Sequence, residues 1–216
     1  HTPVAELLLA RLPVTLELSL LALTVALAIA IPVGILSAVR QDSVADYVAR
    51  SFSILMLAVP GFWIATVVVV FPAIWWGWSP EVKFTPFFES PLANFQQLIV
   101  PALIMGTSLS AVTIRMMRTT MLEVLRQEYV RTAWAKGLSE RVVVTRHVLK
   151  NALIPVVTVI GLQATLLIGG SVIMEQIFVI PGMGLLLIEA VFDRDYPIVT
   201  GVFLVTGVAI VLINFL

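Results

Sequence analysis

The uncharged stretch from Ser51 to Pro80 limits the folds open to this chain more than any other feature. A helix of about 20 apolar residues is long enough to cross the hydrocarbon core of a bilayer. Of all residues, 60% are hydrophobic and 12% are charged, whereas soluble domains carry about 25% charged residues. The sequence therefore predicts a membrane protein.

Five stretches meet or approach the length of a membrane-spanning helix. They cover residues 18–39, 52–78, 98–114, 152–174 and 198–216. We therefore expect an all-α membrane protein with one transmembrane domain over residues 1–216. The first residue is His1 rather than Met, and the chain stops at Leu216 inside an apolar run, so we expect the protein to continue beyond both ends.

The basic residues lie mainly on one side of the predicted membrane. Arg40 and Arg50 flank the connection between the first two spans, and eight more Lys or Arg lie in residues 115–151, which together makes ten of the 13. Cytoplasmic loops are enriched in Lys and Arg. We therefore expect this side to be cytoplasmic, the end at His1 to be external, and the chain to cross the membrane several times.

Neutral polar side chains occur within the predicted spans, but no ionisable residue lies in the middle of one. The candidate path-lining residues are Thr107, Ser110, Thr158, Gln163 and Ser171. They either line a wet, uncharged path or form hydrogen bonds between helices. The lack of central charges argues against a proton-coupled machine, because charged residues at that depth commonly mark ion relays.

No catalytic or metal-binding pattern is present in the sequence. The chain has no cysteine, its two histidines (His1 and His147) are far apart, and no Gly-x-x-x-x-Gly-Lys-Ser/Thr phosphate loop occurs. Ser171 has no candidate base to activate it. We therefore expect a chain that is not itself an enzyme, with no catalytic residue, metal site, bound cofactor or nucleic-acid partner.

The connection formed by residues 115–151 is far longer than two helices need. An apolar stripe with helical spacing consists of Met121, Leu122, Leu125, Tyr129, Ala133 and Trp134. We expect Gly137 to end a first helix in a left-handed conformation, and Ser139 to cap a second helix over 141–150. Such a projection either receives force from a soluble partner or lies as a basic amphipathic segment on anionic lipid.

The run Glu128-Tyr129-Val130-Arg131-Thr132-Ala133-Trp134-Ala135-Lys136-Gly137-Leu138-Ser139 resembles the cytoplasmic coupling loop of permeases of binding-protein-dependent ABC importers. It is most similar to the branch that serves dipeptides, oligopeptides, nickel and glutathione. The runs Arg146-His147-Val148-Leu149-Lys150-Asn151-Ala152-Leu153-Ile154-Pro155, Pro181-Gly182-Met183-Gly184 and Arg194-Asp195-Tyr196-Pro197 resemble the same branch. The wider family has Glu-Ala-Ala before the glycine, and only Ala133 agrees with that pattern.

The resemblance implies a type I ABC importer permease bundle, whose family core has six spans, five of them in this chain. It also implies a multi-pass position in a bacterial or archaeal cytoplasmic (inner) membrane. The ATPase-coupling residues that it implies are Glu128, Arg131, Thr132, Ala133, Lys136, Gly137, Leu138 and Ser139. The external motif that it implies consists of Pro181, Gly182, Gly184, Arg194, Asp195 and Tyr196.

The resemblance also implies partners. They are a second related permease subunit, two ATP-binding subunits that hold ATP and Mg²⁺, a periplasmic or lipid-anchored solute-binding protein, and membrane lipid. The ATPases would pull on the loop and rock the spans between inward-open and outward-open states, to import peptides or related small solutes. Nickel or glutathione is the alternative cargo, and a stand-alone secondary transporter or channel is the alternative class.

Overall fold

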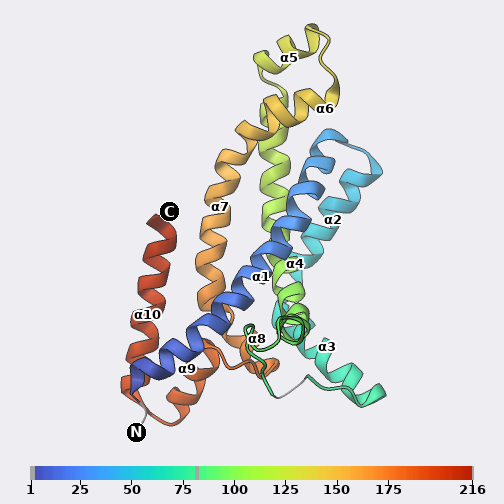
Figure 1. Ribbon diagram of the computed structural model, residues 1–216. Helices are drawn as coiled ribbons and strands as arrows, with labels where there is room; N and C mark the ends of the chain where they lie inside the picture. The colour runs from blue at the N-terminus through green and yellow to red at the C-terminus, as the bar shows by residue number, and fades with distance from the viewer. Residues whose placement is uncertain (1–2, 81–82, 216) are drawn as a thin grey trace. The chain divides into compact units, whose positions relative to one another are not determined.

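The computed structural model describes residues 3–80 and 83–215, and this described part is helical without a strand (Figure 1). The helices are α1 (Val4–Val39), α2 (Val44–Ala58), α3 (Gly61–Trp76), α4 (Pro91–Leu125), α5 (Glu128–Ala135), α6 (Glu140–Val142), the π-helix η1 (Val143–Val148), α7 (Leu149–Gly170), α8 (Val172–Ile177), α9 (Met183–Phe192) and α10 (Tyr196–Phe215). The predicted all-α fold is confirmed. His1, at the end predicted to be external, and Leu216, the last residue of the fifth predicted span, lie outside the described residues.

Within the described residues, four helices are long and apolar enough to cross a membrane: α1, α4, the continuous segment Glu140–Gly169, and α10. The pair α2 and α3 makes a fifth candidate span. The span predicted over 52–78 is divided between these two helices, because the chain leaves the helical conformation at Val59 and Pro60. Proline lacks an amide hydrogen and disfavours helical geometry in the residue before it, which explains the break.

The chain divides into two compact units, and α1, α4 and α7 each contribute to both. The first unit contains the chain up to Thr24, Val59–Gly106, and the chain from Leu162 onward. The second unit contains Val25–Ala58 and Thr107–Gly161. The predicted external motif therefore belongs to the first unit, and the predicted coupling loop, residues 115–151, belongs to the second.

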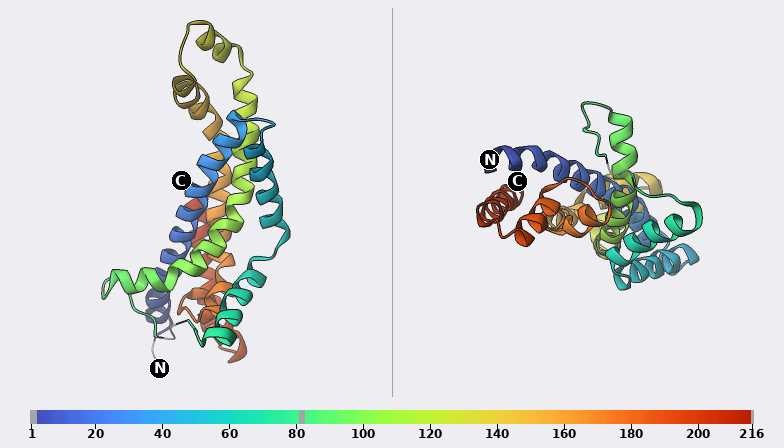
Figure 2. Two further views of the ribbon diagram at one scale, coloured as in Figure 1. Left: turned by 90° about the vertical axis from the view of Figure 1, so that its right-hand side faces the viewer. Right: turned by 90° about the horizontal axis from the view of Figure 1, so that it is seen from below.

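The first unit has a small apolar core where the beginning of α1 packs beside α9 and α10 (Figure 2, right). Its buried members are Leu8, Met183, Leu186 and Val202. A Cβ atom at Gly201 would lie 2.9 Å from the Leu8 side chain, so the glycine permits the close approach of α10 to α1.

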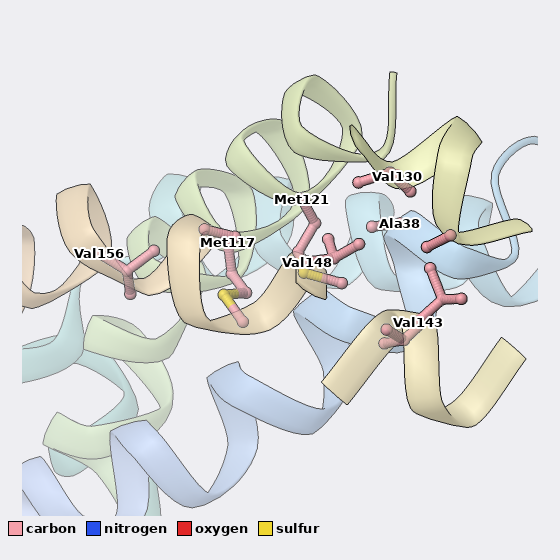
Figure 3. Close-up of a cluster of buried hydrophobic side chains, with 10 residues drawn as sticks. Ala38, Met117, Met121, Val130, Val143, Val148 and Val156 are labelled. Atoms are coloured by element: carbon pink, nitrogen blue, oxygen red, sulfur yellow. The ribbon is translucent and has the colours of Figure 1, made fainter. Parts of the chain in front are cut away.

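The second unit has a larger core, to which α1, α4, α5, η1 and α7 contribute (Figure 3). Its buried members are Ala38, Met117, Met121, Val130, Ala133, Val143, Val144, Val148, Ala152 and Val156. In Figure 2 (left), α2 runs beside the last turns of α1 and α4. At Gly34 a Cβ atom would lie 2.7 Å from the Met117 Cβ, so this glycine lets α1 and α4 approach closely.

Candidate functional site

The predicted coupling loop is a projection made of α5, α6 and η1, which extends past the ends of α4 and α7 (Figure 1). The predicted apolar stripe is only partly right, because α4 ends at Leu125 and α5 is a separate helix. Met121 and Ala133 are buried, whereas the side chains of Tyr129 and Trp134 are 43% and 42% exposed. Two helices that point in different directions cannot continue one helical stripe.

Gly137 ends the projection's first helix as the sequence predicts. Its φ angle is +77°, in the left-handed region. The Gly137 amide donates a hydrogen bond to the Trp134 carbonyl (2.9 Å), and the Leu138 amide donates one to the Ala133 carbonyl (3.4 Å). This pair of bonds is the Schellman termination of a helix. Among the described residues, no heavy atom lies within 4 Å of the place a Cβ would take, so backbone conformation rather than packing requires glycine.

The second helix begins after Ser139, whose backbone is extended as expected of a capping residue. The Ser139 side chain makes no capping hydrogen bond, so the predicted side-chain cap is wrong. From Glu140 the chain continues without interruption through α6 and η1 into α7. The π-helical geometry of η1 was not predicted; short π segments in α-helices are frequent at functional sites.

The short helix α5 has an apolar side and a charged side. Val130 and Ala133 are buried in the core of the second unit, at 0% and 4% exposed. The remaining predicted coupling residues on and after the helix are exposed or half-buried: Glu128, Arg131, Thr132, Lys136, Leu138 and Ser139. Arg131 Nη1 lies 2.8 Å from Glu128 Oε1, and both side chains are largely solvent-exposed. The charged face of α5 is therefore exposed on the part of the chain that the structure describes.

Side chains tie α5 to the beginning of α7. The side-chain amide of Asn151 donates a hydrogen bond to Tyr129 Oη at 2.7 Å. It also donates to the carbonyl oxygen of His147 at 3.2 Å, and Tyr129 Oη donates to that carbonyl at 3.4 Å. These hydrogen bonds therefore connect α5 directly to the beginning of α7.

A buried ion pair lies in the second unit, and the sequence did not reveal it. Arg118 donates to both carboxyl oxygens of Asp46, from Nε at 2.7 Å and from Nη2 at 2.8 Å. The Ser37 hydroxyl and the Asp42 amide donate to the same carboxyl group at 2.6 and 3.0 Å. The group is thereby bound to α1, to the α1–α2 turn and to α4. The signal in the sequence is the position of Asp46 between Arg40 and Arg50, two basic residues that otherwise indicate only the orientation of the chain in the membrane.

Glu175 organises the predicted external motif, and it was also missed. Its side chain is fully buried. Oε1 accepts hydrogen bonds from the hydroxyls of Thr15 and Ser171, both at 2.8 Å. Oε2 accepts from the amides of Gly184 (2.7 Å) and Leu185 (3.0 Å), in the first turn of α9. Four donors thus satisfy a carboxyl group that would otherwise be costly to bury.

The glycines of the external motif are explained by close packing against Val172 and Glu175 of α8. A Cβ atom at Gly182 would overlap its carboxyl group, and one at Gly184 would overlap Val172. The Met183 amide donates to Thr15 Oγ1 at 2.8 Å and so extends the network into α1. The signal in the sequence was that Glu175 is the one charged residue between Lys150 and Glu189.

The rest of the external motif forms the turn between α9 and α10. Arg194 has a φ angle of +57°, and the Asp195 amide donates to the Ala190 carbonyl at 2.8 Å, which closes α9. Asp195 Oδ1 then accepts from the Ile198 amide at 3.2 Å and caps α10. Tyr196 is 72% exposed. This part of the motif therefore fixes a helix–helix corner.

The candidate path-lining residues are divided between the units. Thr107, Ser110 and Thr158 belong to the second unit, and Gln163 and Ser171 belong to the first. Ser110 donates to the Thr107 carbonyl at 2.7 Å, and Ser171 donates to Glu175. Thr158 is exposed, whereas Gln163 is buried. Their role in a path stays a prediction.

The comparison with known proteins agrees with this geometry. Residues 30–216 match the family model of the binding-protein-dependent transport system inner membrane component. The chain belongs to this family of inner-membrane transport components. A putative peptide transport system permease protein of Brucella suis is 42% identical over 214 residues, which cover 99% of this chain and 68% of that protein.

Further relatives have similar names. The oligopeptide transport system permease protein AppB of Bacillus subtilis is 42% identical over 217 residues, covering 99% of this chain and 68% of that protein. The dipeptide transport system permease protein DppB of Escherichia coli is 38% identical over 237 residues, covering 99% and 70%. Among solved structures, an inward-facing MetNI methionine ABC transporter chain aligns with a TM-score of 0.74 at 18% identity, covering 100% of this chain and 94% of that chain. The predicted permease fold is confirmed.

Proposed function

We propose that this chain is a membrane-spanning subunit of an ATP-driven importer and that residues 115–151 couple it to a separate ATPase. One observation carries the proposal: Val130 and Ala133 of α5 are buried in a core shared with α1, α4, η1 and α7, while the opposite face of α5 is charged and exposed. Close-packed interiors transmit displacement. A force applied to the exposed face would therefore move several helix ends together.

The proposed partners follow from this role. Two ATPase subunits would hold ATP and Mg²⁺, and this chain would bind neither. A second related permease subunit would complete the translocation path, and a periplasmic or lipid-anchored solute-binding protein would deliver cargo externally. The concentration of Lys and Arg supports a cytoplasmic position for residues 115–151.

The proposed cargo is a peptide. The names of the oligopeptide and dipeptide permeases among its relatives support this class. Proteoliposomes that contain the complete assembly would be tested for uptake of labelled di- and oligopeptides, with nickel and glutathione as parallel cargoes. Uptake of either alternative in place of peptides would overturn the substrate assignment, and ATP-independent uptake without the ATPase would favour a secondary transporter.

The coupling role is tested by cross-linking, since the chain has no cysteine of its own. A single cysteine replaces the exposed Trp134 on α5, and a matched cysteine replaces the exposed Glu89 before α4. We expect the Trp134→Cys chain to cross-link to the ATPase and to resist an impermeant maleimide applied outside intact cells. The Glu89→Cys chain should do the reverse. External labelling at position 134 would refute the proposed orientation.

A further inference from the structure

We infer that a groove in the second unit binds an anionic phospholipid, with its phosphate at one end and an acyl chain along the other. The groove has a volume of about 490 Å³ and lies between the last turns of α1 and the α6–η1 segment. It is lined by Pro32, Ile35, Leu36, Val39, Arg40, Glu140, Arg141, Val144 and Thr145.

One end of the groove suits a hydrocarbon chain. Five of the lining residues are apolar, and three of these, Pro32, Leu36 and Val39, follow one another along the last turns of α1. Leu36 is 50% exposed although it lies on a helix apolar enough to span a membrane. Contact between water and an apolar surface is unfavourable. At the end of a membrane-spanning helix, an acyl chain of a lipid can cover that surface.

The other end suits a phosphate group. Arg40 and Arg141 both line the groove and are solvent-exposed. Neither forms an ion pair with any residue that the structure describes. A guanidinium group offers parallel N–H donors that match phosphate oxygens. With Glu140 in the same wall, the lining carries a net charge of +1, which complements the single negative charge of a phosphodiester.

The combination identifies the occupant. A free anion would leave the apolar wall of Pro32 and Leu36 uncovered, and an acyl chain without a charged headgroup would leave both arginines unpaired. Basic pockets beside membrane helices on the cytoplasmic side are suited to anionic lipid headgroups. None of the lining residues lies on α5, although four of them lie within residues 115–151. The inference rests on the cytoplasmic orientation proposed above, but it needs no contact with an ATPase.

The test measures lipid binding to the purified intact assembly by native mass spectrometry, with titrations of phosphatidylglycerol, phosphatidylcholine and phosphatidylethanolamine. We expect phosphatidylglycerol to bind most tightly. Arg40→Gln and Arg141→Gln should each weaken it about fivefold, as expected for loss of one basic contact with an anionic lipid. Leu36→Trp, which fills the apolar end without a change in charge, should also weaken it.

Arg126→Gln is the matched control, because it removes the same charge from an exposed position of the same unit outside the groove. Thermal unfolding checks that each variant is folded. An equal loss in Arg126→Gln would indicate diffuse attraction and overturn the inference. So would equal affinity for phosphatidylcholine, tighter binding of phosphatidylethanolamine, or displacement of the lipid by inorganic phosphate.

Discussion

Tyr129 and Asn151 lie 22 residues apart in sequence, yet the amide of Asn151 donates a 2.7 Å hydrogen bond to the hydroxyl of Tyr129. The two residues stand on opposite sides of the Gly137 turn, one on α5 and the other at the beginning of α7. The projection is therefore closed by side chains as well as by the backbone. A displacement of α5 can therefore reach α7 through the backbone and through the Tyr129–Asn151 hydrogen bond.

Tyr129→Phe should lower peptide uptake per ATP hydrolysed, because it removes the hydrogen bond with Asn151 and keeps the aromatic ring. A hydrogen bond of this kind contributes about 1 kcal/mol, so we expect partial uncoupling of a few-fold with normal membrane insertion. Uptake and hydrolysis are measured together in proteoliposomes. Tyr47→Phe, at an exposed tyrosine outside the projection, is the control. An unchanged ratio in Tyr129→Phe would show that the bond plays no part in coupling.

Gly137→Val should disrupt coupling through the backbone alone. A side chain meets no described neighbour there, but the left-handed conformation costs a non-glycine residue about 1–2 kcal/mol. Gly137→Asn should be milder, since asparagine tolerates this conformation. Hydrogen exchange of the Leu138 amide and peptide uptake report the two effects. Equal losses in the valine and asparagine variants would point to a packing role instead.

Asp46→Asn should destabilise the protein by about 2 kcal/mol or more, because it removes the buried charged partner of Arg118. The control is Glu128→Gln, which breaks the exposed pair with Arg131 and should cost less than about 1 kcal/mol. Thermal unfolding in detergent compares the two. If the variants unfold at the same temperature, the Asp46 pair does not stabilise the second unit.

Glu175→Ala should loosen the corner between α8 and α9, since it leaves two hydroxyls and two amides without their acceptor. Each buried polar group without a partner costs about 1–3 kcal/mol. We expect lower thermal stability and faster hydrogen exchange at Gly184 and Leu185. Glu189→Ala, at an exposed acid on the same α9 helix, should leave both unchanged. Normal protection of the two amides in Glu175→Ala would contradict the role of Glu175 in holding the first turn of α9.

Hydropathy located the membrane helices well but not their ends. The predicted first span began at residue 18, whereas α1 begins at Val4, because Glu6, Arg11 and Glu17 are compatible with a helix although they lower its hydropathy. The break at Pro60 is readable from proline chemistry, because Pro60-Gly61 interrupts the helical pattern within the charge-free stretch. The local turn at Gly137 was predictable because it depends on one residue's conformation.

The buried acids could not be placed from a single sequence. Hydropathy treats a charge as the boundary of a span, so it predicts that Glu175 lies in a loop. Its partner Thr15 lies 160 residues away, and no local pattern joins them. Asp46 and Arg118 are likewise 72 residues apart. Only the folded chain brings such partners together.

The π-helical segment η1 has a consequence for how this projection tolerates change. A π turn accommodates an extra residue within an α-helix, so deletion of one residue between Val143 and Val148 would restore ordinary helical geometry. The extra residue is taken up within the segment, so the helix before the deletion would keep nearly the same rotation around the α7 axis. A deletion in the ordinary α-helical part of α7 would instead turn everything before it by about 100°. The π segment therefore tolerates the loss of a residue that the rest of the helix does not.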